Sequence, residues 1–129
     1  MITSPYDKYR QSSVKTSSPA QLLLMLYDGA IRFCKAAIEG VDSVDYTKVN
    51  TSLGKVQTIV TELITTLDRS YEVSNQLYSL YEYINHLLIQ ANIKKKKEPI
   101  EEAVGYLLEL RQTFAQAAAM TAGQDLQNG

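Results

Sequence analysis

The segment from Ser18 to Gly40 constrains this chain more than any other, because it predicts a long helix with unusually little polar surface. Ser18 can cap the helix, Pro19 suits its first position, and Gln21 completes a Ser-x-x-Gln capping box. Gly40 predicts the end, because glycine readily adopts the left-handed conformation that often follows a helix. On a helical wheel the polar residues share a wedge of about 60°; they are Gln21, Asp28, Arg32, Lys35 and Glu39.

The rest of this helix, from Leu22 to Ile38, is apolar or small apart from the hydroxyl group of Tyr27. A surface helix needs an apolar stripe a little over ~100° wide, and this helix has about twice that width. It must therefore be buried on several sides or offer a second apolar face to something else. We expect Leu24, Tyr27 and Ile31 to contribute to that second face.

Three further helices are predicted by apolar residues that recur at steps of three and four. They run from about residue 45 to 70, from about 74 to 95, and from Pro99 to about 122. Their main apolar stripes comprise Val49, Leu53, Val56, Val60, Leu63 and Leu67, then Leu77, Leu80, Tyr81, Ile84, Leu87, Leu88 and Ala91, and finally Ile100, Ala103, Val104, Leu107, Leu110, Phe114 and Ala118.

Short connections between these helices predict that sequential helices are antiparallel neighbours. The expected fold is all-α, an antiparallel up-down-up-down four-helix bundle over residues 18–122 with a disordered tail over residues 123–129. Residues 1–17 lack a helical period and form an arm. Tyr6, Tyr9 and Val14 are large apolar groups that a solvated leader does not need, so this arm is either an incidental leader or a segment that docks on an apolar groove.

Composition excludes several classes of protein. The chain has 129 residues, which favours one domain, and a net charge of −1 gives no electrostatic footprint for nucleic acid. The single cysteine, Cys34, lies on the apolar side of its helix and is interpreted as a buried hydrophobic residue. Apolar runs are too short to insert into a membrane, and no secretory leader is apparent. We therefore expect a soluble cytoplasmic protein.

No set of residues predicts catalysis, a metal site or a cofactor. The one histidine, His86, points away from the apolar stripe of its helix and lacks the Glu-x-x-His pairs of a di-iron bundle. It also lacks the following basic and small residues of a histidine phosphotransfer domain, because Ile89 and Gln90 occupy that turn. Asp28 and Arg32 are spaced to form an ion pair of modest strength.

The sequence does not fix the role of three further surface features. Arg111 interrupts the apolar stripe of the last helix, so it either extends to the end of the bundle or pairs with a carboxylate or carbonyl beside a groove. Tyr78 lies in a second, weaker apolar patch of the third helix with Ile89 and Ile93. The run Lys94–Lys97 is a solvated loop or a docking point for an acidic partner.

Several motifs along the chain form one combined pattern. It begins with Pro5-Tyr6 followed by Tyr9, with Val14, Thr16 and Pro19, and with the stretch LLLMLYDGAI over residues 22–31 and Phe33. It continues through Ala91-Asn92-Ile93 to Gly105-Tyr106-Leu107 and Leu110-Arg111. In this pattern the chain resembles the flagellar secretion chaperones of the FliS type, and Phe114 stands where relatives are expected to carry tryptophan.

The resemblance implies a cytoplasmic four-helix bundle, not an enzyme, that binds the C-terminal segment of flagellin, prevents its early polymerisation and presents it to the flagellar export gate. It also implies that the arm covers part of the apolar groove until the guest displaces it. The residues expected to contact partners are Tyr6, Tyr9, Val14, Leu24, Tyr27, Ile31, Tyr78 and Arg111. The alternative is a self-associating helical scaffold, and the free protein is expected to be a monomer or weak homodimer.

Overall fold

The computed structural model describes residues 18–128, and the side chains of residues 18–120. Four helices account for most of this part: α2 (Pro19–Asp42), α3 (Tyr46–Thr65), α4 (Val73–Lys94) and α5 (Glu98–Asn128). No strand occurs within residues 18–128, which confirms the all-α prediction. The predicted arm, with Tyr6, Tyr9 and Val14, lies outside the described residues.

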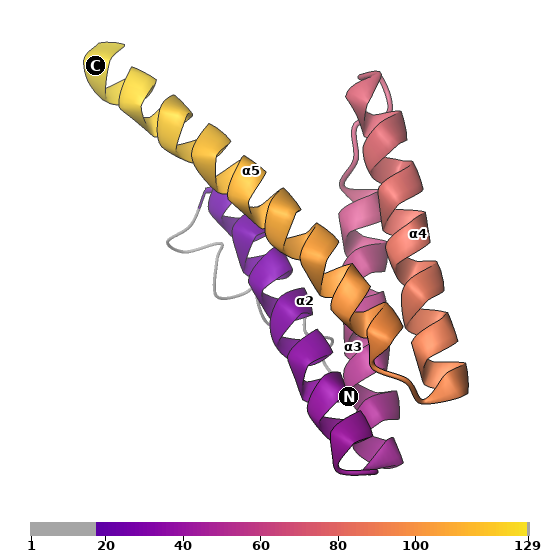
Figure 1. The fold of residues 1–129 in the computed structure, drawn as a ribbon. Helices are drawn as coiled ribbons and strands as arrows, with labels where there is room; N and C mark the ends of the chain where they lie inside the picture. Colours follow the sequence, from indigo (N-terminus) through magenta and orange to yellow (C-terminus); the bar gives the residue numbers. More distant parts are fainter. Residues whose placement is uncertain (1–17, 129) are drawn as a thin grey trace, which may run out of the picture.

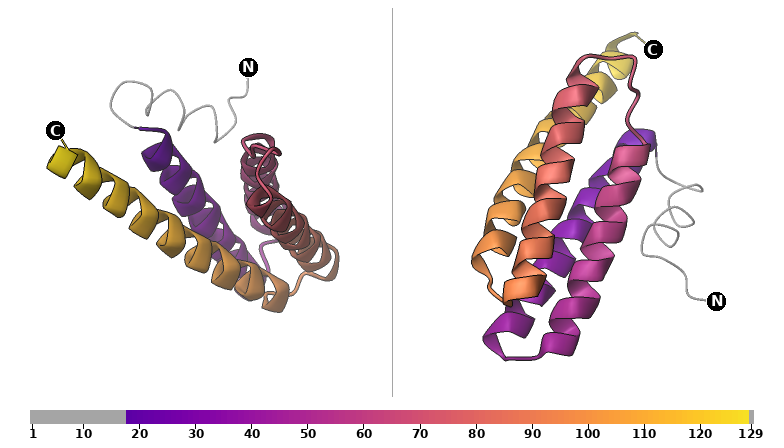
Figure 2. Two further views of the ribbon diagram at one scale, coloured as in Figure 1. Left: turned by 90° about the horizontal axis from the view of Figure 1, so that it is seen from above. Right: turned by 90° about the vertical axis from the view of Figure 1, so that its right-hand side faces the viewer.

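The helices form an antiparallel bundle in which each helix packs against two others (Figure 1). The order around the bundle is α2, α3, α4, α5, and the closest packing joins α2 to α3. The two diagonal pairs, α2 with α4 and α3 with α5, are not neighbours. Figure 2 shows from above that α5 and α2 lie on one side and α3 and α4 on the other. The predicted up-down-up-down bundle is confirmed.

Local capping chemistry sets the first two helix starts. The Ser18 hydroxyl accepts a hydrogen bond from the backbone N–H of Gln21, and the Gln21 side chain accepts one from the Ser18 N–H, both at 3.2 Å. This is the predicted capping box, which satisfies amide groups that a helix start leaves without partners. Asp45 caps α3 by accepting from the backbone N–H of Lys48 at 3.1 Å.

Gly40 does not end α2, so that part of the prediction is wrong. The helix continues to Asp42, and the left-handed backbone occurs at Val44, with φ of 55°. Gly40 is instead a point of close approach between α2 and α3. A Cβ atom placed on it would lie 2.9 Å from Val49 Cγ2 and 3.1 Å from the Asp45 carbonyl oxygen. The absence of a side chain, rather than backbone freedom, is what the fold requires here.

The helix α3 ends at Thr65, earlier than the predicted residue 70. At this point a side-chain hydroxyl bonds to a backbone carbonyl near the end of the helix, because Thr66 Oγ1 donates to the Leu63 carbonyl at 2.7 Å. The following turn is fixed by Asp68, whose carboxylate accepts from the Ser70 N–H at 3.0 Å. Such side-chain bonds compete with the helical ladder. The Ser70 hydroxyl, which donates to Asp68 Oδ1 at 2.6 Å, and the Ser70 N–H together lower the pKa of the Asp68 carboxyl below its ordinary value.

The helix α5 extends to Asn128, beyond residue 122, where the last helix was expected to end. The apolar stripe does fade before that point, but Ala, Gln, Met and Leu supply helix formers and no proline follows Pro99. Gly123 costs a helix about 1 kcal/mol, which is too little to terminate it. In Figure 1 the last turns of α5 project past the start of α2.

The core is continuous through the bundle and uses the predicted apolar stripes. Side chains with no exposed surface come from every helix, among them Ala30, Cys34 and Ala37 of α2, Val49, Leu53, Val56 and Leu63 of α3, Ile84, Leu88 and Ala91 of α4, and Ile100, Ala103 and Leu107 of α5. Cys34 is buried as predicted, and burial raises the pKa of its thiol to about 12.

Candidate functional site

Of the sequence-predicted residues, Ile31 lines a depression together with Asp28, and Arg111 of α5 is hydrogen-bonded to that carboxylate. Leu24 lies one turn before Asp28 on α2. Leu24 is half-buried, and Ile31 retains 7% of its surface, so both reach the edge of the core rather than its centre. Leu108 adds an aliphatic side chain with 47% of its surface exposed, one turn before Arg111. We call Leu24, Ile31, Leu108 and Arg111, together with Asp28, the α2–α5 seam.

An ion pair stands at the centre of this seam. Arg111 donates from Nε to Oδ1 of Asp28, and its second guanidinium nitrogen lies 3.4 Å from Oδ2 of the same carboxylate. Of the interpretations left open by the sequence, the structure selects pairing with a carboxylate. The hydrogen bond and the charge of Asp28 raise the pKa of Arg111 further above its ordinary value. Both side chains keep substantial contact with solvent, at 40% and 49% exposed.

The predicted pairing of Asp28 with Arg32 is therefore not the main interaction of that carboxylate. The Arg32 guanidinium lies 5.2 Å from the centre of the Phe33 ring, and Lys55 of α3 approaches the same ring at 5.0 Å. Both distances fall within the range of cation–π contacts. The spacing of residues within α2 could not show that Asp28 binds Arg111, because Arg111 lies on a different helix.

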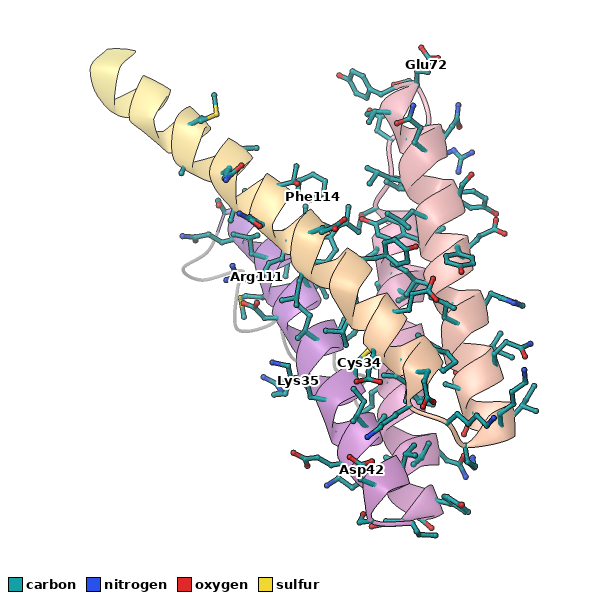
Figure 3. All side chains as sticks on the ribbon, in the orientation of Figure 1. Cys34, Lys35, Asp42, Glu72, Arg111 and Phe114 are labelled. Atoms are coloured by element: carbon teal, nitrogen blue, oxygen red, sulfur yellow. The ribbon has the colours of Figure 1, made fainter. Side chains whose placement is uncertain are left out.

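Shallow depressions flank the ion pair on both sides. One is lined by α5 residues, Leu108, Arg111, Gln112, Ala115, Gln116 and Ala119. The other runs along α2 and is lined by Asp28, Ile31, Arg32, Lys35, Ala36 and Glu39. Figure 3 shows Arg111 on the side of α5 next to α2, with Phe114 one turn further along. The α5 depression carries Leu108 and Ala115 beside a fixed charge pair, an arrangement that can bind an amphipathic segment.

Tyr27 lies in the core rather than on the second face that the sequence assigned to it. It has no exposed surface, its ring stacks on Phe114 at 5.8 Å, and its hydroxyl is hydrogen-bonded to the Tyr81 hydroxyl. Burial raises the pKa of both tyrosine hydroxyls, so they remain protonated. The partner contact predicted for Tyr27 therefore requires the core to open.

Tyr78 is separated from the other candidates, because it lies on α4 near the connection to α3. Its ring is half-buried under the Arg69 guanidinium, which lies 4.4 Å from the ring centre. Ile89 and Ile93, predicted to share its patch, are 41% and 72% exposed. The structure does not bring Tyr78 together with the α2–α5 seam.

The lysine run joins α4 to α5 and is more structured than a solvated loop. Lys95 adopts the left-handed conformation, with φ of 52°, and its ammonium group donates to Asn50 and Asn92. Lys97 pairs with Asp42 at 3.1 Å, which raises the pKa of the lysine. Lys94 and Lys96 are exposed. Half of the run thus has contacts within the bundle.

A surface cluster of aromatic rings was missed in the sequence. Tyr83 stacks on His86 at 6.4 Å and meets Tyr106 edge-on at 6.0 Å, while its hydroxyl donates to Glu102 at 2.8 Å. His86 is exposed, as predicted. The cluster joins α4 to α5, and no spacing within one helix could have revealed it.

Among the described residues no helix combines the length and apolarity that a membrane crossing needs, and no cluster of His, Cys, Asp and Glu is arranged to hold a metal ion.

The fold and surface define an all-helical bundle whose first helix reaches solvent through half-buried apolar residues. A family model described as "Flagellar protein FliS" matches residues 2–121, and the chain belongs to this family. Proteins named "Flagellar secretion chaperone FliS" are similar over most of their length. The Bacillus subtilis (strain 168) protein is 38% identical over 116 residues, covering 90% of this chain and 87% of the relative.

The Campylobacter jejuni protein of that name is 33% identical over 101 residues, with 77% of this chain and 79% of the relative covered. The Salmonella typhimurium protein is 30% identical over 118 residues, with 89% and 87% covered. The predicted family is thereby confirmed. Membership supports a role as a chaperone in flagellar secretion.

Proposed function

We propose that this protein is a cytoplasmic export chaperone that binds the C-terminal segment of flagellin, prevents its premature polymerisation and delivers it to the flagellar export gate. The observation that carries the proposal is membership of the FliS family, whose relatives are named as secretion chaperones. The relatives' name describes a binding protein, and the proposal includes no catalytic activity and no cofactor.

The α2–α5 seam is the binding surface that best fits such a guest. Leu24 and Ile31 line it from α2, and Leu108 lies exposed on α5. A guest helix with apolar residues every three or four positions would cover these side chains. The Asp28–Arg111 ion pair lies beside these apolar side chains and fixes the register of a guest that carries a polar residue at that point.

The arm has a part in this proposal. Residues 1–17 carry Tyr6, Tyr9 and Val14, and the described part of α2 has half-buried apolar residues from Leu22 to Met25. We propose that the arm covers apolar surface of α2 in the free protein and is displaced by the guest. Covering such surface limits aggregation, and the arm then competes with weak guests.

The direct test is calorimetry with a peptide of the flagellin C-terminal segment, accompanied by circular dichroism. Binding with a negative heat-capacity change and a gain of helix in the peptide is expected, since a disordered segment folds as it buries apolar surface. Absence of both heat and spectral change at tens of micromolar peptide would reject the proposal.

A pair of matched variants then tests the location. Leu108→Ala removes an exposed side chain from the seam, whereas Ile93→Ala removes a more exposed one from the outer face of α4. Leu108→Ala should weaken the peptide several-fold and Ile93→Ala should not. The reverse order places the site on α4. Size measurement of the free and bound protein distinguishes a chaperone from a self-associating scaffold.

A further inference from the structure

The Tyr27–Tyr81 hydrogen bond connects two helices that are not otherwise neighbours. The ring of helices places α2 and α4 on a diagonal of the bundle, each packed against α3 and α5. The hydroxyl groups of Tyr27 and Tyr81 meet across that diagonal, in the interior. Phe114 stacks on the Tyr27 ring, so the contact also involves α5. One layer of the core thus connects α2 to α4 through the hydroxyl groups and α2 to α5 through the rings.

This layer divides the bundle into two unequal ends. Toward the α2–α3 turn most core side chains have no exposed surface, as at Val49, Ala91 and Ile100, while Ile38, Val41 and Val104 are half-buried. Toward the start of α2 the apolar residues packed on the core are only half-buried; we call Leu23, Leu67, Leu77, Leu80 and Phe114 the open-end residues. Figure 1 shows α5 diverging from α4 toward that end.

Two hydroxyl groups in such a layer favour an all-or-none opening. While the layer is closed, each hydroxyl has the other as its partner. Partial separation would leave two buried polar groups without partners, which is unfavourable until water can enter. Water enters most readily from the open end, because more of the side chains packed on the core are half-buried there than at the opposite end. The pair therefore stabilises the closed state and also permits a fully hydrated open one.

We propose that the Tyr27–Tyr81 pair is a latch that holds α4 against α2 at the open end of the bundle. Its release exposes the open-end residues together, while the end near Val49 and Ala91 stays folded. The latch concerns the free chain and goes beyond the proposed function, since it holds whatever guest the protein binds. It assigns a conformational role to the one sequence-predicted contact residue that the structure buries completely.

The test is amide hydrogen exchange on the free, full-length protein, followed by mass spectrometry of peptides. Tyr27→Phe and Tyr81→Phe each leave one buried hydroxyl without its partner. Exchange should accelerate roughly tenfold in residues 73–80 and 110–118, a factor typical of one orphaned hydroxyl. Residues 49–56 and 88–94 should keep their wild-type rates. Tyr83→Phe is the matched control, because Tyr83 lies two residues along α4 and its hydroxyl bonds to Glu102 on the surface.

The double variant Tyr27→Phe/Tyr81→Phe separates the hydrogen bond from the packing of the rings. With both hydroxyls removed, no polar group is orphaned, but the bond between the helices is also lost. Exchange in residues 73–80 and 110–118 should therefore stay faster than in wild type, although slower than in either single variant. Equal acceleration in all four helices, no acceleration in the single variants, or a wild-type rate in the double variant would each overturn the latch. None of these measurements uses flagellin, so failure of the proposed function leaves the test intact.

Discussion

Replacing Gly40 by alanine tests the packing of α2 against α3, which is the closest contact between helices in the bundle. The new Cβ atom would lie 2.9 Å from Val49 Cγ2, 3.1 Å from the Asp45 carbonyl oxygen and 3.1 Å from the Val49 backbone nitrogen. The first of these contacts can relax by movement of a side chain. The other two involve backbone atoms at the start of α3, so relief requires α2 and α3 to move apart.

The expected magnitude follows from two opposing effects. Overpacking a well-packed site costs typically ~1–3 kcal/mol, whereas alanine gains about 1 kcal/mol over glycine in a helix interior. Gly54 and Gly105 supply matched controls, because a Cβ atom added at either meets no atom within 4 Å. Both controls should therefore be stabilised by roughly 0.5–1 kcal/mol, and Gly40→Ala should lie about 1–3 kcal/mol below them.

Urea unfolding followed by circular dichroism measures these differences, since a change of 1 kcal/mol moves the midpoint by roughly 0.5 M when the slope is about 2 kcal/mol/M. Equal slopes for all variants are needed for the comparison. If Gly40→Ala is stabilised as much as Gly54→Ala, the close approach at Gly40 does not limit the fold, and the reasoning fails.

Two further predictions concern the buried thiol and the arm. Native Cys34 should resist a thiol reagent at pH 8 and react once urea unfolds the chain, because burial raises its pKa to about 12 from an ordinary 9.0. Between these values the unfolded state loses a proton that the folded state keeps, so stability should fall as the pH rises above 9; reaction of the native thiol at the unfolded rate would contradict this. Tyr9→Ala should keep the melting temperature within a few degrees but change flagellin affinity by about 1 kcal/mol or more, with Tyr71→Ala as an exposed control. Unchanged affinity after Tyr9→Ala and after deletion of residues 1–15 would make the arm a simple leader.

The starts of the helices were predictable because the chemistry of a start is local. Ser18 and Gln21 form the capping box within one turn, and Asp45 caps α3 in the same way. The ends depended on groups elsewhere. Gly40 looked like a terminating glycine, yet its small size serves α3, and the left-handed residues are Val44 and Lys95. Neither residue type favours that conformation, so no sequence rule points to it.

The bundle topology was predictable because four apolar stripes and short connections leave few alternatives. The site was only partly predictable, because a helical wheel gives the direction of a side chain but not the partner that it meets. Arg111 was recognised as unusual, but the carboxylate that it binds belongs to Asp28, which lies 83 residues earlier in the sequence. Tyr27 fell on the broad apolar arc of α2, and only the position of Tyr81 on the diagonal helix shows that this ring points inward.

The excess apolar surface of the first helix thus has two different explanations along its length. The core buries the middle and later part of α2, since this helix packs on both α3 and α5 and faces α4 across the diagonal. The fully buried side chains there include Tyr27, Ala30, Cys34 and Ala37. Leu22, Leu23, Leu24 and Met25, near its start, remain half-buried where α5 diverges from α4. A helix that only needed a core would lose apolar residues where its neighbours separate, and α2 instead gains them. That increase, rather than the total apolar surface, is the feature of the chain that favours a binding role for this end of the bundle.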